Sequence, residues 1–371
     1  MCVSSAVGQN AAPAVRIVNP IVENQLVTLG GTVDPLANAN NDRGAAPDST
    51  PLERIHLMLK RSPSQQAALD QLVSQLHTPG HPNYHKWLTP DQFGKQFGPS
   101  DQDIATVETW LTGHGFNVTG ALPGKQVIEF SGNVGQFRSA FHAQIHEYQV
   151  NGESHFANAS NPQIPAAIAP VVGGFVSLNN FHAKKQSKLV GKARYDRTTD
   201  TATPMPGWTW GTGSAPGSID FVLAPQDFAV EYDLNPLYTS STPVTGSGQT
   251  IAIINDSNVN INLVNQFRSL FSLPANPPQV IIDGNDPGID GINNPDGPNG
   301  DSIEAYLDVE WAGAVAPNAT IDLVIAADTE LQTGLALAAE HAVFSNLAPL
   351  MSLSFGNCEL KDGGSDRKSV V

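Results

Sequence analysis

Residues 301–326 read D-S-I-E-A-Y-L-D-V-E-W-A-G-A-V-A-P-N-A-T-I-D-L-V-I-A, and they join a predicted helix to a predicted buried strand. The helix is expected near residues 303–314. The run T-I-D-L-V-I-A that follows is short, apolar and rich in β-branched residues, as in strands of a parallel sheet covered on both faces. This stretch therefore predicts an α/β architecture for the part of the chain around it.

Strand and helix alternate through the rest of the second half. Three more runs are strand-like: Q-T-I-A-I-I-N at 249–255, Q-V-I-I-D at 279–283 and P-L-M-S-L-S-F at 349–355. Further helices are expected near 262–271 and 330–345. This order predicts a doubly wound sheet with ligands beyond the carboxyl ends of its strands. Only a polar tail follows the last strand, so we expect the α/β domain, residues 223–371, to be incomplete.

The first half has a different pattern. Residues 1–50 are expected to form an extended arm, and residues 51–183 mix helices with short antiparallel strands, which predicts a compact α+β domain. Residues 184–222 lose periodicity and open with several lysines, so they are interpreted as a linker with a site of proteolytic cutting.

Composition excludes several functions. The chain has 371 residues and a formal net charge of −16, and such a surface repels nucleic acid and anionic lipid. No apolar run reaches the roughly 18 residues that a membrane-spanning helix needs. The two cysteines, Cys2 and Cys358, have no metal-ligand spacing, and the amino terminus is not a complete secretory signal.

Glu304 and Asp308 lie four residues apart on the predicted helix and would share one of its faces. Two like charges in this arrangement cost an isolated helix roughly 0.2–0.5 kcal/mol. Ordinary solvated helix residues would be one explanation for the pair. The other is a function that needs two neighbouring carboxylates.

The residues around the pair favour the second explanation. The stretch E-A-Y-L-D-V-E-W-A-G-A-V-A-P-N-A-T-I-D-L-V, followed by S-L-S-F-G-N-C-E, closely resembles the sedolisin or kumamolisin-like serine-carboxyl peptidases. In the first half, L-E-R-I-H-L-M-L-K, P-N-Y-H-K-W-L-T-P-D-Q-F and V-S-L-N-N-F resemble the activation domain of that family. The resemblance covers residues 16–359.

The resemblance implies the precursor of a secreted, acid-acting endopeptidase with a subtilisin-like fold and a Ser-Glu-Asp catalytic set. It assigns Glu304 as general base and Asp308 as the residue that orients it, and a carboxylate base in place of histidine suits acid. Ser354, Phe355 and Gly356 correspond to a strand that would pair with an extended protein or peptide substrate. Their alternative interpretation is a plain buried strand end. Asp301 and Glu310 flank the pair, and Glu310 would face elsewhere on the helix.

Other parts of the family's site do not occur in this sequence. The motifs G-T-S-x-x-x-P, with the catalytic serine, and G-D-S-G, with the oxyanion aspartate, are both missing. The calcium site expected of a full-length member would lie beyond this sequence, so no metal residues are predicted here. We therefore expect the chain as given to be an inactive, carboxy-terminally truncated precursor, secreted in its complete form.

Two other functions compete with this interpretation. Residues 51–183 could act as an intramolecular chaperone or inhibitor for a related peptidase, a role that needs no catalytic residue. A dinucleotide-binding protein is disfavoured, because no G-x-G-x-x-G lies between a strand and a helix. A hypothesis about activation also arises from His56, His81, His85, His142 and His146, which would gain charge as the pH falls through about 6.5 and weaken apolar docking.

Overall fold

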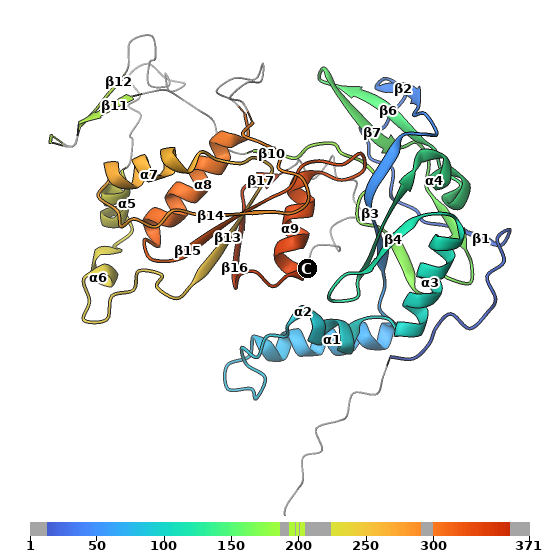
Figure 1. Ribbon diagram of the computed structural model, residues 1–371. Helices are drawn as coiled ribbons and strands as arrows, with labels where there is room; N and C mark the ends of the chain where they lie inside the picture. Colours follow the sequence, from blue (N-terminus) through green and yellow to red (C-terminus); the bar gives the residue numbers. More distant parts are fainter. Residues whose placement is uncertain are drawn as a thin grey trace, which may run out of the picture.

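A computed structural model describes residues 13–185, 193–196, 198–199, 201–204, 224–290 and 300–356. Two units lie side by side in it, one built from the first half of the chain and one from the second (Figure 1). The amino-terminal residues 1–12, most of the predicted linker and processing site in 184–222, and the tail 357–371 with Cys358 lie outside the described residues.

The first unit is an α+β domain built on an antiparallel sheet. Its strand order is β4-β5-β3-β9, and β3 is flanked on both sides, pairing Leu57 with Ile128 of β5 and with Phe175 of β9. The strands are β3 (Pro51–Leu59), β4 (Asn117–Ala121), β5 (Val127–Asn133) and β9 (Val172–Phe175). Smaller sheets join β2 (Asp42–Ala45), β6 (Ile145–Val150) and β7 (Glu153–Asn158), and β1 (Leu26–Thr28) with β8 (Gln163–Pro165).

Capping residues set the starts of the helices in this unit. Ser62, Thr89 and Asn133 each accept a hydrogen bond from the backbone N–H three residues on, and a glutamine there returns one, so all three are capping boxes. The helices are α1 (Pro63–Leu76), α2 (Pro90–Phe97), α3 (Asp101–Gly113) and α4 (Val134–Phe141). Their buried faces close one continuous core around Phe130, Phe137 and Phe141.

The second unit is a parallel sheet with helices on both faces. The strand order is β14-β15-β13-β16, and all three pairings are parallel. The strands are β13 (Thr250–Asn255), β14 (Gln279–Ile282), β15 (Thr320–Ile325) and β16 (Leu350–Leu353). The helices are α5 (Pro225–Glu231), α6 (Asn235–Tyr238), α7 (Ile261–Leu270), α8 (Ser302–Val315) and α9 (Gly334–Phe344).

Alternate residues of the strands belong to separate cores. Ile253 and Leu323 pack with α7 and α8, whereas Ile254 and Val324 pack with α9. This is the double burial that the continuous apolar runs predicted. Both faces of the sheet are covered, so the residues at its carboxyl edge are held in a fixed arrangement.

The α+β first half and the parallel α/β second half are confirmed as predicted. Helix α9 begins four residues later than expected, because Thr333 caps it and Gly334 packs too closely on the sheet for a side chain. A Cβ added to Gly334 would lie 1.9 Å from the carbonyl oxygen of Ala326. The subtilisin-like detail and the boundaries 1–50, 51–183, 184–222 and 223–371 stay predictions.

Two short pairings involve the residues after the first unit. Strand β11 (Ala193–Asp196) pairs with β12 (Thr201–Pro204), and β10 (Lys184–Lys185) pairs antiparallel with β17 (Phe355–Gly356). Figure 1 shows β10 and β17 near α8 and α9, at the top of the parallel sheet. The start of the predicted linker is therefore a strand on the second unit.

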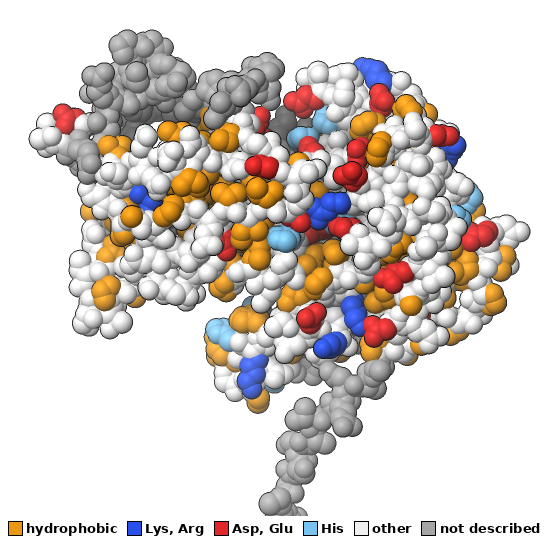
Figure 2. Space-filling model, in the orientation of Figure 1, with side chains coloured by type: hydrophobic (Ala, Val, Ile, Leu, Met, Phe, Trp, Pro, Cys, Tyr) orange, Lys and Arg blue, Asp and Glu red, His pale blue; other side chains and the backbone are white. Residues whose placement is uncertain are grey.

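A polar seam joins the two units. We define it by Arg54, His56 and Glu129 of the first unit and Asp283 and Glu340 of the second. Arg54 Nη2 lies 2.8 Å from Asp283 Oδ2, and His56 Nδ1 lies 2.6 Å from Glu340 Oε2. Figure 2 shows basic, acidic and histidine side chains gathered where the units meet.

One residue of the second unit enters the core of the first. Leu331, in the loop between β15 and α9, is fully buried among the residues of the first unit's core. The next residue, Gln332, is also fully buried and donates from Nε2 to the carbonyl oxygen of Arg54 at 2.5 Å. This loop therefore fixes the first unit to the second beside the polar seam.

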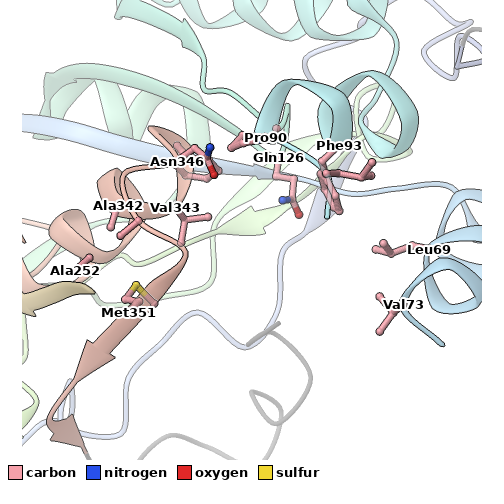
Figure 3. A pocket seen from close by; sticks show the side chains of 14 residues that line it. Leu69, Val73, Pro90, Phe93, Gln126, Ala252, Ala342, Val343, Asn346 and Met351 are labelled. Atoms are coloured by element: carbon pink, nitrogen blue, oxygen red, sulfur yellow. The ribbon is translucent and has the colours of Figure 1, made fainter. Parts of the chain in front are cut away.

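Farther along the junction the packing is loose. A cavity of about 400 Å³ lies between Leu69 and Val73 of α1 on one side and Val343 and Met351 of the second unit on the other. Figure 3 shows these side chains facing each other across the space. The polar seam and the Leu331 loop thus hold the junction more tightly than the helices α1 and α2 do.

Candidate active site

Helix α8 positions the two carboxylates that the sequence singled out. The helix leads into β15 and packs its small residues Ala305 and Val309 on the parallel sheet. Because it runs back along the sheet, its first turns lie at the carboxyl edge of the strands. Glu304 and Asp308 follow one another on the adjoining face of the helix, one turn apart.

The Asp308 carboxyl group is only partly solvated. Its Oδ1 accepts a hydrogen bond from Ser354 Oγ at 2.9 Å, whereas its Oδ2 is buried and has no hydrogen-bond partner among the described residues. The pKa of Asp308 is raised to about 6, because burial and, to a smaller extent, the charge of Glu304 outweigh the lowering effect of the Ser354 hydrogen bond. This carboxyl group can therefore exchange a proton in mild acid.

Glu304 is the more deeply placed member of the pair, with 3% of its surface exposed. A carboxylate so buried is found in proteins where a partner compensates for its lost hydration. Its charge contributes to the raised pKa of Asp308. The structure thus brings together the two residues that the sequence paired.

The strand after β16 lies beside this pair. Ser354 directly precedes β17, and its hydroxyl group links β17 to Asp308. Lys184 pairs with Gly356 and Lys185 with Phe355 in the antiparallel register. The three residues predicted to bind an extended peptide therefore lie together, and a segment of the same chain already pairs with two of them.

Two other acids on or beside α8 have raised pKa values. Burial raises the pKa of Glu310 to about 8 and also raises that of Asp301. Glu310 lies two residues beyond Asp308, which places it on another face of the helix. A raised pKa alone does not distinguish a catalytic group, and the position of Glu310 separates it from Ser354 and β17.

The sequence analysis missed two acids at the same edge of the sheet. Burial, followed by the charges of Asp301 and Asp328, raises the pKa of Asp256 to about 7. Asp328 Oδ2 lies 2.8 Å from His182 Nε2, and this hydrogen bond raises the pKa of His182 to about 9. Both acids follow the carboxyl ends of strands, a position that could have marked them as site residues.

The described residues contain no group of three or more His, Cys, Asp or Glu side chains that could hold a metal ion. Across the same parts of the chain, no helix has the length and apolar character needed to cross a membrane.

Comparison with known proteins fits this arrangement. Residues 38–181 match the family described as "Pro-kumamolisin, activation domain". Sedolisin of Pseudomonas sp. (strain 101) is 27% identical over 311 residues, which cover 83% of this chain and 49% of sedolisin. Kumamolisin of Bacillus sp. (strain MN-32) is 25% identical over 292 residues, which cover 75% of this chain and 46% of kumamolisin.

A third relative matches a shorter part of the chain. Xanthomonalisin of Xanthomonas sp. (strain T-22) is 27% identical over 179 residues, which cover 48% of this chain and 21% of xanthomonalisin. The chain thus spans at most about half the length of these relatives.

The activation-domain match and the parallel α/β unit that follows it support a class of protein, a peptidase precursor that begins with an activation domain. The activation-domain match and the similarity to these three relatives support a sedolisin-family precursor. The activation domain accordingly has an intramolecular, propeptide-like relation to the unit that follows it.

Proposed function

We propose that the complete protein is a secreted endopeptidase that works in acid, with Glu304 as general base and Asp308 as the residue that orients it. The observation that supports this most is the position of the pair on α8, joined through Ser354 to the strand β17 that binds an extended segment. The nucleophile would be a serine outside this sequence, as the family resemblance implies.

The chemistry follows from the protonation of the pair. A serine hydroxyl group needs a base whose pKa lies near the working pH, so that the base is ionised often enough to take the proton. Glu304 would accept the serine proton, and Asp308, with a pKa of about 6, would be protonated beside it in mild acid. A site with an ionised base beside a protonated Asp308 is suited to catalysis in mild acid.

Strand β17 would bind the substrate backbone. An extended peptide adds to an exposed strand through main-chain hydrogen bonds, which provide affinity, while pockets for its side chains provide specificity. In the precursor β10 occupies this place, so the protein's own Lys184–Lys185 segment would exclude substrates until it is displaced. This occupancy, and the missing nucleophile, are reasons to expect no activity from the chain as given.

Further features of the complete protein rest on the family alone. Secretion and a bound calcium ion are expected from the resemblance, with the calcium ligands outside this sequence. We propose that cleavage falls within residues 184–222, where the chain leaves the activation domain. Protein or peptide substrates would be the partners, with neither nucleic acid nor membrane.

The test uses the full-length precursor, processed at acid pH. Glu304→Gln should lower kcat/KM on a denatured protein substrate by about 10³-fold or more, as losses of catalytic groups do in serine peptidases. Glu310→Gln, on another face of the same helix, is the matched control and should stay within about threefold of wild type. Full activity of Glu304→Gln would refute the assigned base.

A second function is favoured by the large core of the first unit. Phe130, Phe137, Phe141 and their neighbours form a continuous core, so residues 51–183 could serve as a folding assistant or inhibitor of a related peptidase. Leu331 supplies part of that core from the other unit, which argues that the domain works best in its own chain. Adding residues 51–183 to a homologous peptidase distinguishes the roles: absence of inhibition would exclude the second.

A further inference from the structure

The Lys185 side chain occupies a defined place beside the candidate site. Its Nζ donates a hydrogen bond to the carbonyl oxygen of Gly300 at 2.6 Å and lies 3.9 Å from Asp301 Oδ1. The side chain is 17% exposed, so most of its length is covered by protein. The ammonium group thus has a backbone acceptor and a carboxylate acceptor in one partly buried place.

Acidic groups surround this place beyond the direct contacts. Asp290 Oδ2 accepts the backbone N–H of Asp301 at 2.8 Å, and Asp256 lies close enough for its pKa to respond to the charge of Asp301. Burial raises the pKa of Asp301 overall, and Lys185 is the stronger of the two cations, Lys185 and His182, that oppose this shift. A neutral side chain here would leave these acids without that compensation.

The backbone register relates this place to the candidate site. Lys185 is opposite Phe355, so a peptide bound in the same antiparallel register would present its next residue to Ser354, whose hydroxyl group is bonded to Asp308. A peptide side chain in the place of Lys185 would therefore immediately precede the peptide residue that lies opposite Ser354, next to the carboxylate pair.

We propose that Gly300 and Asp301 form a subsite for a basic side chain, lysine or arginine, in the peptides that β17 binds. This inference rests on the proposed function, since it names the substrate class of the same site. The Gly300 carbonyl oxygen and the Asp301 carboxylate both accept hydrogen bonds and neither donates one, so the subsite selects a donor that carries positive charge. Asp301 is the specificity-determining residue.

The first test needs no catalysis and uses the chain as given. Hydrogen exchange of the Phe355–Gly356 amides reports whether β10 is paired with β17. Lys185→Met and Asp301→Asn should each speed this exchange by about tenfold or more, whereas Lys185→Arg should retain the protection. Asp70→Asn, on α1, is the control and should not change it. Equal protection in wild type and Lys185→Met would overturn the proposal.

The second test measures selectivity in the processed full-length protein. Two quenched-fluorescence peptides differ in lysine or norleucine at the position before the residue that faces Ser354, and mass spectrometry identifies the cleaved bond. We expect kcat/KM to be about tenfold or more higher for the lysine peptide, and the ratio to fall toward one in Asp301→Asn but not in Asp70→Asn. Equal cleavage of both peptides would overturn the subsite.

The two tests separate this inference from the function beneath it. If neither peptide is cleaved while Lys185→Met still unpairs β10, the peptidase function fails and the preference of the strand for a basic side chain stands. If both peptides are cleaved equally, the peptidase function stands and the subsite fails.

Discussion

Glu129 of the polar seam and Asp308 of the candidate site are both partly buried carboxylates, yet their pKa values move in opposite directions. A hydrogen bond from His56, together with the charge of Arg54, lowers the pKa of Glu129 to about 2 despite burial. Burial and the neighbouring charge of Glu304 raise the pKa of Asp308 to about 6. The identity of the neighbour, a cation or a second carboxylate, decides which way a buried acid shifts.

The difference separates two ranges of pH. Stabilisation by the Glu129 ion pairs is present above the ordinary glutamate pKa of 4.5 and is lost as the pH falls toward about 2. Asp308 behaves oppositely: its raised pKa opposes folding above about pH 6, and this penalty is relieved as the pH falls toward 3.8. Mild acid therefore protonates Asp308 while Glu129 stays charged.

The seam also changes the expected role of histidine. Burial lowers the pKa of His56, but its contacts with Glu129 and Glu340 outweigh burial and raise it overall. Stabilisation from protonated His56 is present below pH 6.5 and is lost as the pH rises through the raised pKa. Protonation of His56 thus strengthens docking, the opposite of the weakening expected from sequence. At His56, the contacts across the seam therefore do not support the hypothesis that histidine protonation weakens docking.

The largest effect should come from breaking the seam. Glu129→Ala would leave His56 and Arg54 without their shared carboxylate and should lower the free energy of unfolding by about 3–5 kcal/mol, the usual cost of breaking a buried ion pair. Urea unfolding measures the change. Glu147→Ala, exposed on β6, is the control and should shift it by about 0.5 kcal/mol or less. An equal change in the free energy of unfolding for both variants would show that the seam contributes no more to stability than an exposed surface residue does.

A smaller effect should follow from emptying the core contact beside the seam. Leu331→Ala should cost about 2–3 kcal/mol and should speed hydrogen exchange in β3, because the loop no longer holds the first unit. Leu337→Ala, buried in the α9 core, should destabilise the second unit but leave exchange in β3 as in wild type. Unchanged β3 exchange in Leu331→Ala would contradict a docking role for this side chain.

The smallest effect concerns the hydrogen bond at the candidate site. Ser354→Ala removes the donor that opposes the upward shift of Asp308, so the apparent pKa of Asp308 should rise by less than one unit. Carboxyl-carbon NMR during a pH titration measures it, and Ser352→Ala in β16 serves as the control. A fall in the pKa on removing the hydroxyl group would mean that Ser354 does not act as the donor.

Local patterns predicted much of this architecture. Apolar runs identified all four parallel strands, and the spacing of Glu304 and Asp308 placed them on one face of α8. The late start of α9 was missed because it depends on close packing of Gly334 against the sheet. The seam could not be predicted, since Arg54 and Asp283 are 229 residues apart and their contact arises only from docking.

The pairing of Lys184–Lys185 with β17 was also beyond sequence patterns. A basic, aperiodic segment is typical of an exposed linker, and two residues are too few to show the alternation of a strand. Asp256 lies directly after a predicted strand, so a systematic search of the carboxyl ends would have found it. Contacts between segments that are far apart in the sequence cannot be predicted from local residue patterns.

The central claim is that the Asp308 carboxyl group, beside the charge of Glu304, titrates in mild acid. Its most direct test is the pH titration of the Asp308 carboxyl carbon by NMR, with the signal assigned by its loss in Asp308→Asn. We expect an apparent pKa of about 6 in the wild type and a lower value in Glu304→Gln, where the neighbouring charge is gone. An ordinary aspartate pKa that Glu304→Gln leaves unchanged would contradict the account.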